Sequence, residues 1–562
     1  MRTVRSGDVA LAVYEHGDPA DPAVLLIHGY PDDHQMWDGV VARLASRFHV
    51  VTYDVRGAGA STRPREVSRY RLEYLAGDLL AVADAVSPVE PVHVVAHDWG
   101  SIQAWQAVTE PHTRIASYTS ISGPSLDHIG HWTRSRMRRP TRRGLRQVVN
   151  QQLRSWYILA FHTPFLAALA WRLGVAKQLA RSEGLPRVPS AADGIHGMKL
   201  YRANIFQRVG APRERRTDVP VQVIVPTADR YVTAALTEDL ARWVPNLWRR
   251  KVIGSHWVPA LRPDVIARMV DEFVSHVGGE PVTKSLRRAA VGAPRKSFSD
   301  SLVVVTGAGS GIGRATALEF SSAGADVVVT DIDLTAAQAT VDLIGPSATA
   351  YRLDVTDEPA VRRLADQVAL EHGVPDVVVN NAGIGIAGAF MDTSAKDWQR
   401  VIDVNLLGVV HGCKAFAELM IEAGEGGQIV NVASAAAYVP SRVLSAYSAT
   451  KSAVLMLSEC LRAELAGQGI GVTAICPGIV DTPITRSTTY VGVASQEERR
   501  ERAARSYRKR NFPPSRVATE IVAAAAKNRA VVPVTPEAKA GLLGSRFAPG
   551  VMRRLARIEV GK

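Results

Sequence analysis

The chain has 562 residues, of which 46% are hydrophobic and 22% charged, and its formal net charge is +13 at pH 7. This length is too great for one hydrophobic core and predicts roughly two to four domains, while the composition is that of a globular protein. We find no signal peptide and no uncharged apolar run of about eighteen residues. We therefore expect a cytoplasmic protein. Any contact with a membrane should be peripheral.

Cysteine usage and charge narrow the function classes further. Cys413, Cys460 and Cys476 are odd in number, lack CxxC spacing and stand in apolar sequence, which predicts buried reduced thiols rather than disulfides or a metal site. Much of the positive charge falls in residues 131–146 and 499–510. No nucleic-acid-binding motif accompanies these runs, so we expect a solvated surface, or contact with acidic lipid or an anionic substrate, rather than specific nucleic-acid binding.

Short apolar runs alternate with helix-like segments from Val24 onward, which predicts a mostly parallel sheet with helices on both faces. Residues of about 124–218 contain no strand-like run and read as a helical lid over the carboxyl edge of this sheet. Residues 278–299 are rich in Gly, Pro, Lys and Arg and predict a linker. The same alternation restarts after it, so we expect one α/β domain at 1–277 and a second at 300–562.

The first chemical motif is AHDWG at 96–100, which follows a predicted strand. Small residues on both sides of a strand-to-helix turn are typical of the nucleophile elbow of α/β-hydrolases, and here the nucleophile is Asp98. Asp229 and His256 follow later strands in the order acid, then histidine. A carboxylate nucleophile can form an ester at an sp³ carbon, His256 can activate water to cleave it, and Asp229 can orient that histidine. The backbone amides of Tyr30 and Trp99 are the candidate oxyanion donors.

Four motifs of the first half, HGYP, HDWG, TADRYV and GSHWVP, resemble the epoxide hydrolases of the α/β-hydrolase superfamily over about 275 residues. That family has two lid tyrosines that donate hydrogen bonds to the epoxide oxygen, and the resemblance implies Tyr157 in SWYILAFHTP and Tyr201 in HGMKLYRAN. A neutral phenol matters because the epoxide opens to an alkoxide. Haloalkane dehalogenases share the Asp-His-Asp arrangement and remain an alternative, although the tyrosine pair favours an epoxide.

The second chemical motif is TGAGSGIG at 306–313, between a predicted strand and a predicted helix. Gly307 permits a tight turn, Gly311 permits close approach of a pyrophosphate, and Gly313 permits close helix packing. Asp331 ends the next strand, eighteen residues after Gly313. An acid at this position accepts hydrogen bonds from a ribose 2′-hydroxyl and repels a 2′-phosphate, and no cation follows it. The sequence therefore predicts NAD, with NADP less favoured.

Tyr447 and Lys451 stand four residues apart in YSATK and share one face of a predicted helix. A neighbouring ammonium lowers the pKa of a phenol, so Tyr447 can exchange a proton with an alcohol or ketone oxygen. Ser434 can orient that oxygen.

These and further motifs, NNAG, VNLLG and PGIVDTP among them, resemble the short-chain dehydrogenase/reductases from Leu302 to about Pro533. The resemblance implies that Asn405 links Lys451 to a proton relay, that Asp354 meets the adenine, and that Ile479 and Thr482 neighbour the nicotinamide amide. It also implies that the cofactor contacts Ser310, Ile312, Val355, Asn381, Ala382, Gly383, Pro477 and Gly478, besides Tyr447 and Lys451.

The order of hydrolase then dehydrogenase resembles fusions found in actinobacteria. The leading hypothesis is a bifunctional enzyme that acts on small epoxides and on alcohols or ketones, with hydrophobic or lipid substrates favoured by the apolar lid. Oxidation of the diol product to a hydroxyketone is a hypothesis motivated by the fusion, and a homo-oligomer through the second domain is also expected. The non-enzymatic alternative makes one half a scaffold that tethers the other to a membrane or partner.

Overall fold

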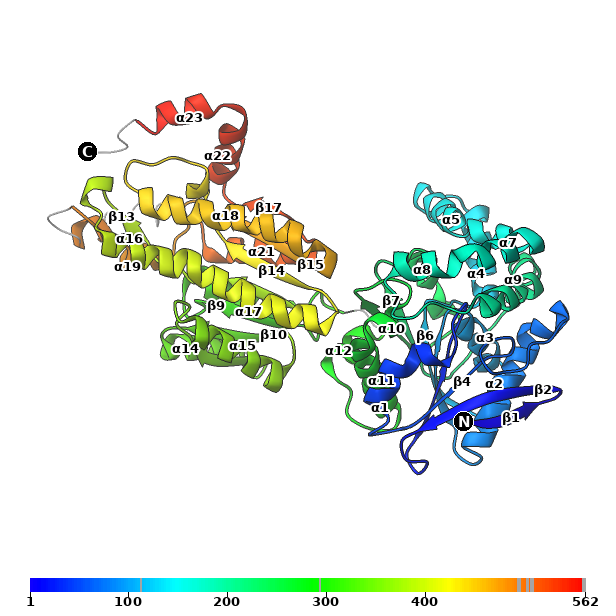
Figure 1. Ribbon diagram of the computed structural model, residues 1–562. Helices are drawn as coiled ribbons and strands as arrows, with labels where there is room; N and C mark the ends of the chain where they lie inside the picture. The colour runs from blue at the N-terminus through cyan, green and yellow to red at the C-terminus, as the bar shows by residue number, and fades with distance from the viewer. Residues whose placement is uncertain (112–113, 293–294, 493–496, 502–504, 506–509, 558–562) are drawn as a thin grey trace. The chain divides into compact units, whose positions relative to one another are not determined.

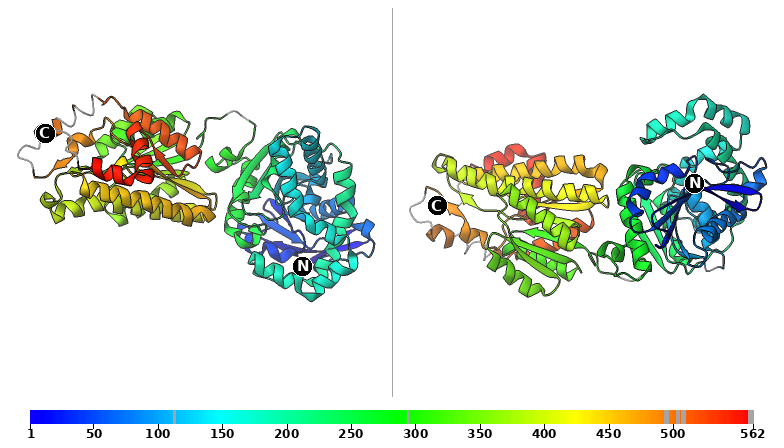
Figure 2. Two further views of the ribbon diagram at one scale, coloured as in Figure 1. Left: turned by 90° about the horizontal axis from the view of Figure 1, so that it is seen from above. Right: turned by 60° about the horizontal axis from the view of Figure 1, so that its bottom comes forward.

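The chain, described here from a computed structural model, divides into two compact units, Met1–Ala293 and Pro294–Lys562 (Figure 1). The structure describes residues 1–111, 114–292, 295–492, 497–501, 505 and 510–557. Each unit contains a large sheet that lies between helices (Figure 2), so the predicted α/β class is confirmed for both halves. Within the second basic run, residues 502–504 and 506–509 lie outside the described residues.

The sheet of unit 1 has the order β1-β2-β4-β3-β5-β6-β7-β8, with β1 and β2 antiparallel to their neighbours and the remaining pairs parallel. Strands such as AVLLI and VHVVAH are buried along their whole length because helices cover both faces. The strands are β1 Arg2–Ser6, β2 Val9–His16, β3 Ala23–Ile27, β4 His49–Tyr53, β5 Val92–His97, β6 Ile115–Ile121, β7 Val221–Pro226 and β8 Leu247–Val252.

The helices that pack on this sheet are α1 Asp38–Leu44, α2 Leu72–Val86, α3 Trp99–Val108, α10 Val258–Leu261 and α11 Pro263–Val277. Six more helices stand between β6 and β7 and form the segment that we call the lid; Figure 1 shows them in cyan to teal at one end of the unit. They are α4 Leu126–Arg138, α5 Arg142–Arg154, α6 Trp156–Phe161, α7 Pro164–Ala170, α8 Ala176–Glu183 and α9 Ala191–Gly210, with a π-helical turn at Trp171–Val175.

The segment expected to be a linker without regular structure contains helix α12, Lys284–Ala289. The Thr283 side chain accepts a hydrogen bond from the Leu286 amide, and the Leu286 side chain is fully buried. Downstream, the Val291 amide donates to the Leu247 carbonyl of β8 at 2.8 Å. A helix cap and one anchoring leucine therefore attach most of this segment to unit 1, an arrangement that its overall composition does not reveal.

The sheet of unit 2 has the order β11-β10-β9-β12-β14-β15-β17, and all of its pairs are parallel. The order reverses between β9 and β12, where doubly wound sheets bind ligands at their carboxyl ends. The strands are β9 Leu302–Thr306, β10 Asp326–Asp331, β11 Ala348–Arg352, β12 Val377–Asn380, β14 Gly427–Val432, β15 Ile470–Cys476 and β17 Val531–Pro533, and a separate pair comprises β13 Ile386–Ala387 and β16 Thr489–Tyr490.

The helices of unit 2 are α13 Gly311–Ser322, α14 Leu334–Ile344, α15 Glu358–His372, α16 Ala395–Ile402, α17 Gly408–Ala423, α18 Ser445–Leu465, α19 Ile484–Ser487, α21 Pro514–Ala526, α22 Pro536–Phe547 and α23 Pro549–Leu555. Within the described residues one helical stretch, Ala395–Ala423, has the length and apolar composition of a membrane span, and half of it is buried inside the fold. The prediction of three buried thiols is wrong for Cys460, which lies on the solvent side of α18, whereas Cys413 and Cys476 are buried.

Candidate active sites

Asp98 occupies a sharp turn between β5 and α3. Its backbone has φ of +49° and ψ of −121°, a strained combination for a residue with a side chain. Such a turn fits only where its neighbours are small: a Cβ on Gly100 would lie 2.4 Å from the His28 carbonyl oxygen. The turn holds the Asp98 carboxylate, which is 8% exposed, at the carboxyl end of the sheet, where the elbow motif predicts it.

The structure brings Asp98, Asp229 and His256 together from the ends of three strands. The Nδ1 atom of His256 lies 3.0 Å from Oδ2 of Asp229, and its Nε2 atom lies 3.6 Å from Oδ2 of Asp98. The other carboxylate oxygen of Asp229 accepts hydrogen bonds from the amides of Tyr231 and Val232 at 2.8 and 2.9 Å. The imidazole is thus oriented by Asp229 and faces Asp98.

In this cluster the carboxylates favour the charged form of His256, and His256 favours the charged form of Asp229. Burial disfavours a charged imidazole, but the two carboxylates outweigh it and raise the pKa of His256 to about 10. Burial likewise disfavours the Asp229 carboxylate, yet His256 and the two backbone amides lower its pKa to about 2. The two neighbouring carboxylates therefore favour the charged form of His256.

Tyr30 contacts the nucleophile through its backbone and the lid through its side chain. Its amide donates to Oδ1 of Asp98 at 2.8 Å, and its hydroxyl donates to the Gly194 carbonyl of α9 at 2.9 Å. Trp99 is the first residue of α3, so its amide has no partner within the helix. Of the two predicted oxyanion donors, the Tyr30 amide thus contacts the Asp98 carboxylate, and the Trp99 amide belongs to the residue directly after Asp98.

The two predicted lid tyrosines come from different helices and meet above the elbow. The ring centroids of Tyr157 in α6 and Tyr201 in α9 are 5.9 Å apart, and the Tyr201 ring lies 4.8 Å from that of Trp99. Burial, assisted by the charge of Asp98, raises the pKa of both phenols above their ordinary value. Both hydroxyls consequently remain protonated at neutral pH and can act as donors.

Asp32 is a residue of this region that the sequence analysis did not single out. Its carboxylate accepts a hydrogen bond from the Trp257 indole at 2.8 Å. Burial raises its pKa to about 7, against the opposing effect of that bond, and the charge of Asp98 raises it further. The signal was available in the sequence as a carboxylate directly after HGYP, but a proline-acid pair is also an ordinary turn. Asp32 thus adds a titratable group beside the cluster.

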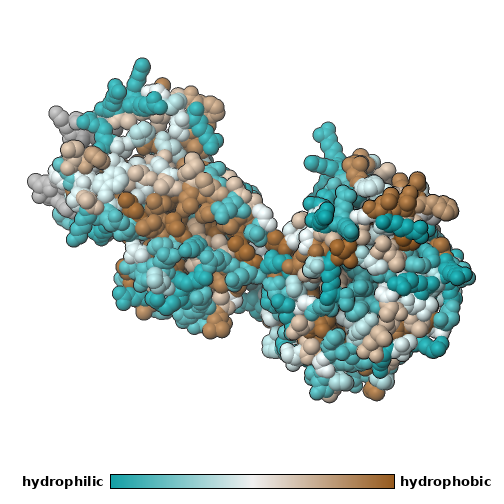
Figure 3. Space-filling model, viewed as in Figure 1, coloured by the Kyte–Doolittle hydropathy of each residue, from teal (hydrophilic) through white to brown (hydrophobic). Residues whose placement is uncertain are grey.

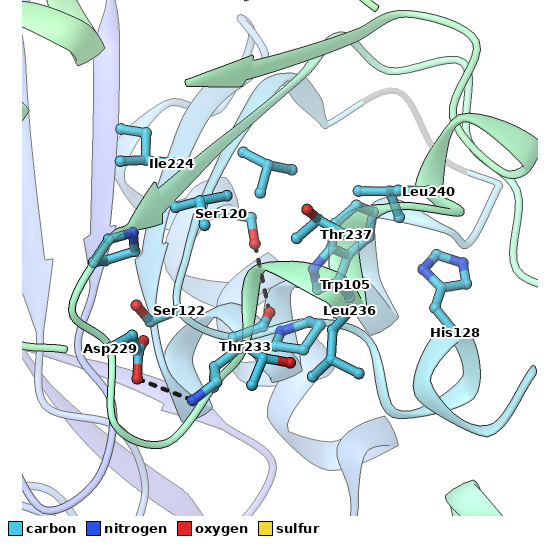
Figure 4. Close-up of a pocket in the computed structure, with 16 residues that line it drawn as sticks. Trp105, Ser120, Ser122, His128, Ile224, Asp229, Thr233, Leu236, Thr237 and Leu240 are labelled. Atoms are coloured by element: carbon cyan, nitrogen blue, oxygen red, sulfur yellow. Dashed lines mark hydrogen bonds between the residues drawn. The ribbon is translucent and has the colours of Figure 1, made fainter. Parts of the chain in front are cut away.

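A cavity of about 30 Å³ lies behind Asp229 and is lined by residues that include Ser122, Thr233 and Leu236 (Figure 4). The hydroxyls of Ser122 and Thr233 are buried, and neither has a hydrogen-bond partner within the described structure. A space of this size suits a water molecule rather than an organic substrate. On the other side of Asp98 the aromatic side chains of Tyr30, Trp99, Tyr157 and Tyr201 pack against one another.

In unit 2 the glycine motif forms the turn between β9 and α13. A Cβ on Gly313 would lie 2.2 Å from the Gly307 carbonyl oxygen, so only glycine permits this closeness of helix and turn. Gly307 and Gly311 have φ of +63° and +56°. Ser310 precedes the helix as its N-cap and Ile312 is half-buried in its first turn. The turn and the helix N-terminus fit the pyrophosphate of a dinucleotide, whose negative charge matches the free amides.

Asp331 stands at the end of β10 beside this turn. One carboxylate oxygen accepts the Gly309 amide at 2.9 Å and the other accepts the Asp333 amide at 3.1 Å. Both bonds leave lone pairs on the carboxylate, and Ile332 next to it is exposed and uncharged. The carboxylate thus retains acceptor capacity for the hydroxyls of an adenosine ribose.

Lys451 is buried in α18 and donates to the Val432 carbonyl at 2.8 Å, while its ammonium lies 5.9 Å from the Tyr447 ring centroid. Burial lowers the pKa of Lys451 to about 8. Asn405 lies in a π-helical turn, Asp403–Leu407, and its side chain exchanges two hydrogen bonds with the backbone of Ile384. A Cβ placed on Gly383 would meet both Asn405 Oδ1 and Lys451 Nζ, so these polar groups share one pocket wall.

The remaining predicted cofactor residues lie around the same edge of the sheet. Ser434 follows β14, and its hydroxyl contacts the Pro477 carbonyl at 3.4 Å. The Asp354 carboxylate accepts hydrogen bonds from the backbone amide and the hydroxyl of Thr356. The residue pattern does not predict these two contacts. The others belong to the loops after β11, β12 and β15: Val355, Asn381, Ala382, Gly478, Ile479 and Thr482.

Glu537 in α22 is a second contact that the sequence analysis missed. Its carboxylate accepts the Ile479 amide at 2.9 Å and a hydrogen bond from Arg510. Burial opposes the charge of Glu537, but these donors lower its pKa. Helix α22 thereby contacts the loop expected to border the nicotinamide, and 58 residues of separation conceal this contact in the sequence.

Comparison with known proteins agrees with this architecture. Residues 22–263 match the model of the alpha/beta hydrolase fold, and residues 301–490 match that of the short chain dehydrogenases. The chain therefore belongs to the proteins that join an α/β-hydrolase domain to a short-chain dehydrogenase domain. It is 44% identical to the probable oxidoreductase EphD of Mycobacterium tuberculosis, over 100% of this chain and 98% of that protein, and belongs to the same family.

The second unit has further relatives. It is 38% identical to sorbitol dehydrogenase of Cereibacter sphaeroides over 178 residues, which are 32% of this chain and 70% of that protein. A short-chain dehydrogenase/reductase from Burkholderia phymatum, solved in complex with NAD, is 31% identical, covers 47% of this chain and 99% of its own, and gives a TM-score of 0.43. The family model and the site together make this protein a bifunctional enzyme whose second unit uses a nicotinamide cofactor.

Proposed function

We propose that unit 1 hydrolyses epoxides to vicinal diols through an ester on Asp98, and that unit 2 interconverts an alcohol and a ketone with NAD. The observation that carries the first half is the joint placement of a carboxylate at the elbow, an Asp229–His256 pair 3.0 Å apart, and two neutral phenols over the same site.

In the first step a carboxylate oxygen of Asp98 attacks a ring carbon of the epoxide, and the carbon–oxygen bond of the ring breaks. The electron pair goes to the ring oxygen, which takes a proton from Tyr157 or Tyr201. Burial favours the neutral form of both phenols, so a proton is available at neutral pH. The products of this step are an alkyl ester on Asp98 and a hydroxyl on the adjacent carbon.

In the second step His256 takes a proton from water, and the resulting hydroxide attacks the ester carbonyl. Ester formation removes the charge of Asp98, one of the two carboxylates that raise the pKa of His256. The pKa of the histidine therefore falls after the first step, so that its proton can pass through solvent to the phenolate, which becomes a phenol again, and the neutral ring can act as a base. The amides of Tyr30 and Trp99 stabilise the oxyanion. Its collapse breaks the bond between the Asp98 carbonyl carbon and the substrate oxygen and leaves a water oxygen on Asp98. The released alkoxide takes the proton of the new carboxyl group and becomes the diol.

For unit 2 the proposal rests on Asp331, Tyr447 and Lys451. The bound nicotinamide supplies the redox chemistry, and the Asp331 carboxylate beside the glycine turn favours a ribose with a free 2′-hydroxyl. Tyr447 exchanges a proton with the substrate oxygen, and the Lys451 ammonium stabilises its phenolate. Asn405, on the same wall as Lys451, orients the proton path from that ammonium.

Single turnover of a panel of aryl and lipid epoxides in ¹⁸O water tests the hydrolase proposal. Excess enzyme should incorporate one ¹⁸O atom into the peptide that contains Asp98, measured by mass spectrometry. Direct attack of water on the epoxide would instead put the label only into the diol and would refute the ester. Release of halide from chloroalkanes, without epoxide turnover, would point to the dehalogenase alternative.

A further inference from the structure

The lid has a second face, directed away from Asp98, that carries large apolar side chains in water. On α5 the exposed residues Leu145, Val149 and Leu153 recur every four positions and so share one face of the helix. On α6 Trp156 and Leu159 are exposed on either side of the inward-facing Tyr157. The same helices that hold the site therefore present an apolar surface to the outside.

This surface continues onto α7 and the π-helical turn that follows it. Phe165 is 88% exposed, Leu166 is 70% exposed and Leu169 is also exposed, whereas Ala167 between them is buried in the lid. Helices α5, α6 and α7 contact one another in sequence, and Figure 3 shows brown residues gathered on the lid beside teal ones. We call this set the outer lid face: Leu145, Val149, Leu153, Trp156, Leu159, Phe165, Leu166, Leu169 and Leu173. Contiguous exposed apolar residues with a polar rim are typical of an interaction site.

The rim of the outer lid face is uniformly basic. Between Asp127 and Glu183 the sequence contains ten arginines, one lysine and no acidic residue. Two of the arginines, Arg136 and Arg143, pair with Glu238 or Asp239 of the body of unit 1. Among the residues that the structure describes, no ion pair engages the exposed Arg138, Arg139, Arg142, Arg146 or Arg172. Positive charge thus accompanies the apolar set at its α4–α5 end and, through Arg172, beside Leu173.

From this combination we infer that the outer lid face docks on an anionic lipid surface. Apolar side chains on one helix face with arginines around them are the features of helices that lie in the interface of a bilayer. A second copy of the chain is a poorer occupant, because a two-fold contact would bring this cationic face against itself. No acidic residue of the stretch is available to relieve that repulsion.

The consequence for unit 1, which rests on the proposed function, concerns how substrates arrive. Tyr157 faces the site while Trp156 and Leu159 of the same short helix face outward. A lipid epoxide that leaves a bilayer at this face crosses one helical layer to reach Asp98. The outer lid face would therefore select epoxides that are dissolved in membranes over those dissolved in water.

Flotation of the full-length protein with phosphatidylglycerol vesicles tests the docking. We expect binding that falls steeply with added salt and is weak on phosphatidylcholine vesicles. Arg142→Glu combined with Arg146→Glu should lower partitioning about 25-fold or more, taking about fivefold for each arginine near an anionic surface. Phe165→Glu combined with Leu166→Glu should lower it more than tenfold.

The matched control is Leu370→Glu, because Leu370 lies in unit 2 and is exposed to the same 88% as Phe165. It should leave flotation unchanged. Failure of the unmodified protein to float at low salt, or an equal loss in the control, would overturn the inference. So would a change of oligomeric mass in the charge variants with no change in flotation, which would make this face a subunit contact.

Failure of the proposed reaction would be recognised separately. Flotation needs no turnover, so an inactive enzyme that still floats rejects the epoxide chemistry and keeps the docking. With an active enzyme, the Phe165→Glu and Leu166→Glu variant should turn over water-soluble styrene oxide normally but lose at least tenfold on an epoxide held in vesicles. Equal rates on both would refute delivery from the bilayer.

Discussion

The Nε2 atom of His256 lies 3.6 Å from Oδ2 of Asp98, while Nδ1 of the same ring lies 3.0 Å from Oδ2 of Asp229. The shorter distance is that of a hydrogen bond and the longer one is that of an ion pair without one. Asp229 therefore holds the ring of His256, and in the proposed mechanism the Nε2 atom faces water after Asp98 has been esterified. Because the two contacts of His256 differ, we expect one substitution to block ester formation and another to block ester hydrolysis.

Replacement of His256 by Gln should stop the reaction at the ester. Asp98 can still be alkylated, but no base remains to activate water, so the adduct accumulates with a burst of one epoxide per chain. Intact-protein mass spectrometry should show an increase by the mass of the substrate. The matched variant with Asp98→Asn added should show none, and an adduct that persists there would place the nucleophile elsewhere.

Removing one lid hydroxyl should slow ring opening without removing it. Because either phenol can donate the proton, Tyr157→Phe and Tyr201→Phe should each reduce kcat about 10- to 100-fold, and the double variant should lose considerably more. Tyr231→Phe is the neighbouring control, since its ring lies 5.7 Å from that of Tyr157 but no donor role is assigned to it. A double variant as active as a single one would contradict shared proton donation.

Replacement of Asp331 by Ala should change which dinucleotide unit 2 prefers. Loss of the ribose hydrogen bonds should raise the Kd for NAD about tenfold, and loss of the negative charge should lower that for NADP, as measured by titration calorimetry. Asp333→Ala is the control two residues away, because the Asp333 side chain caps α14. If both variants change binding equally, general destabilisation rather than ribose recognition is the cause.

The two activities should be separable by single lesions. Asp98→Asn should abolish epoxide turnover and leave NAD-dependent oxidation intact, and Tyr447→Phe should have the reverse effect, each by at least about 1000-fold. Parallel assays of the full-length variants would measure this. If neither substitution alters the reaction of its own unit, a scaffold role for that unit gains support.

Asp32 should give unit 1 a pH-dependent stability. Its pKa is raised to about 7 in the folded state, whereas an unfolded aspartate has a pKa of about 4. Between these values the folded state binds more protons, so stability is full below about pH 4 and falls until the pH exceeds about 7. Asp32→Asn, which can still accept the Trp257 bond, should be more stable than the unmodified protein at pH 8, by at most about 4 kcal/mol, and similar near pH 4.

Urea unfolding followed by tryptophan fluorescence measures this difference, because nine of the ten tryptophans lie in unit 1 and only Trp398 lies in unit 2. Equal midpoints of the two proteins at both pH values would show that Asp32 ionises normally. Glu238→Gln is a suitable control, since that carboxylate pairs with arginines at the surface.

Strands buried on both faces could be predicted because their apolar runs are continuous, as in VLL of β3 and VVV of β9. The apolar runs do not predict strands β1, β2 and β6 of unit 1 or the short strands β13, β16 and β17 of unit 2. The β6 sequence IASYTSI contains buried hydroxyls, and Ser117 is satisfied by a hydrogen bond to His93 in the neighbouring strand. The edge strand β1, RTVRS, is largely exposed and polar. Polar residues that are satisfied by another strand, or by water at an edge, leave no apolar signal.

The residues of the candidate sites likewise divide into those with a local sequence signal and those without one. Asp98, the glycine turn and the Tyr447–Lys451 pair could be found because each is a local motif with fixed spacing. The contacts of Asp32 and Glu537 could not, since their partners Trp257 and Ile479 stand 225 and 58 residues away in the chain, and the position of Asp32 after HGYP does not distinguish it from a turn residue. Contacts of this kind depend on how loops from distant strands meet at one edge of a sheet, which local spacing does not encode.

The two hydrogen bonds of Tyr30 link the position of α9 to the reaction at Asp98. The Tyr30 amide donates a hydrogen bond to the Asp98 carboxylate, and the Tyr30 hydroxyl donates one to the Gly194 carbonyl of the lid. In the proposed mechanism, a movement of α9 away from Asp98 would break the hydrogen bond between the Tyr30 hydroxyl and the Gly194 carbonyl, and Tyr30 is the same residue whose amide contacts Asp98. We therefore expect the reaction at Asp98 and the displacement of α9 to exclude each other, because both depend on Tyr30.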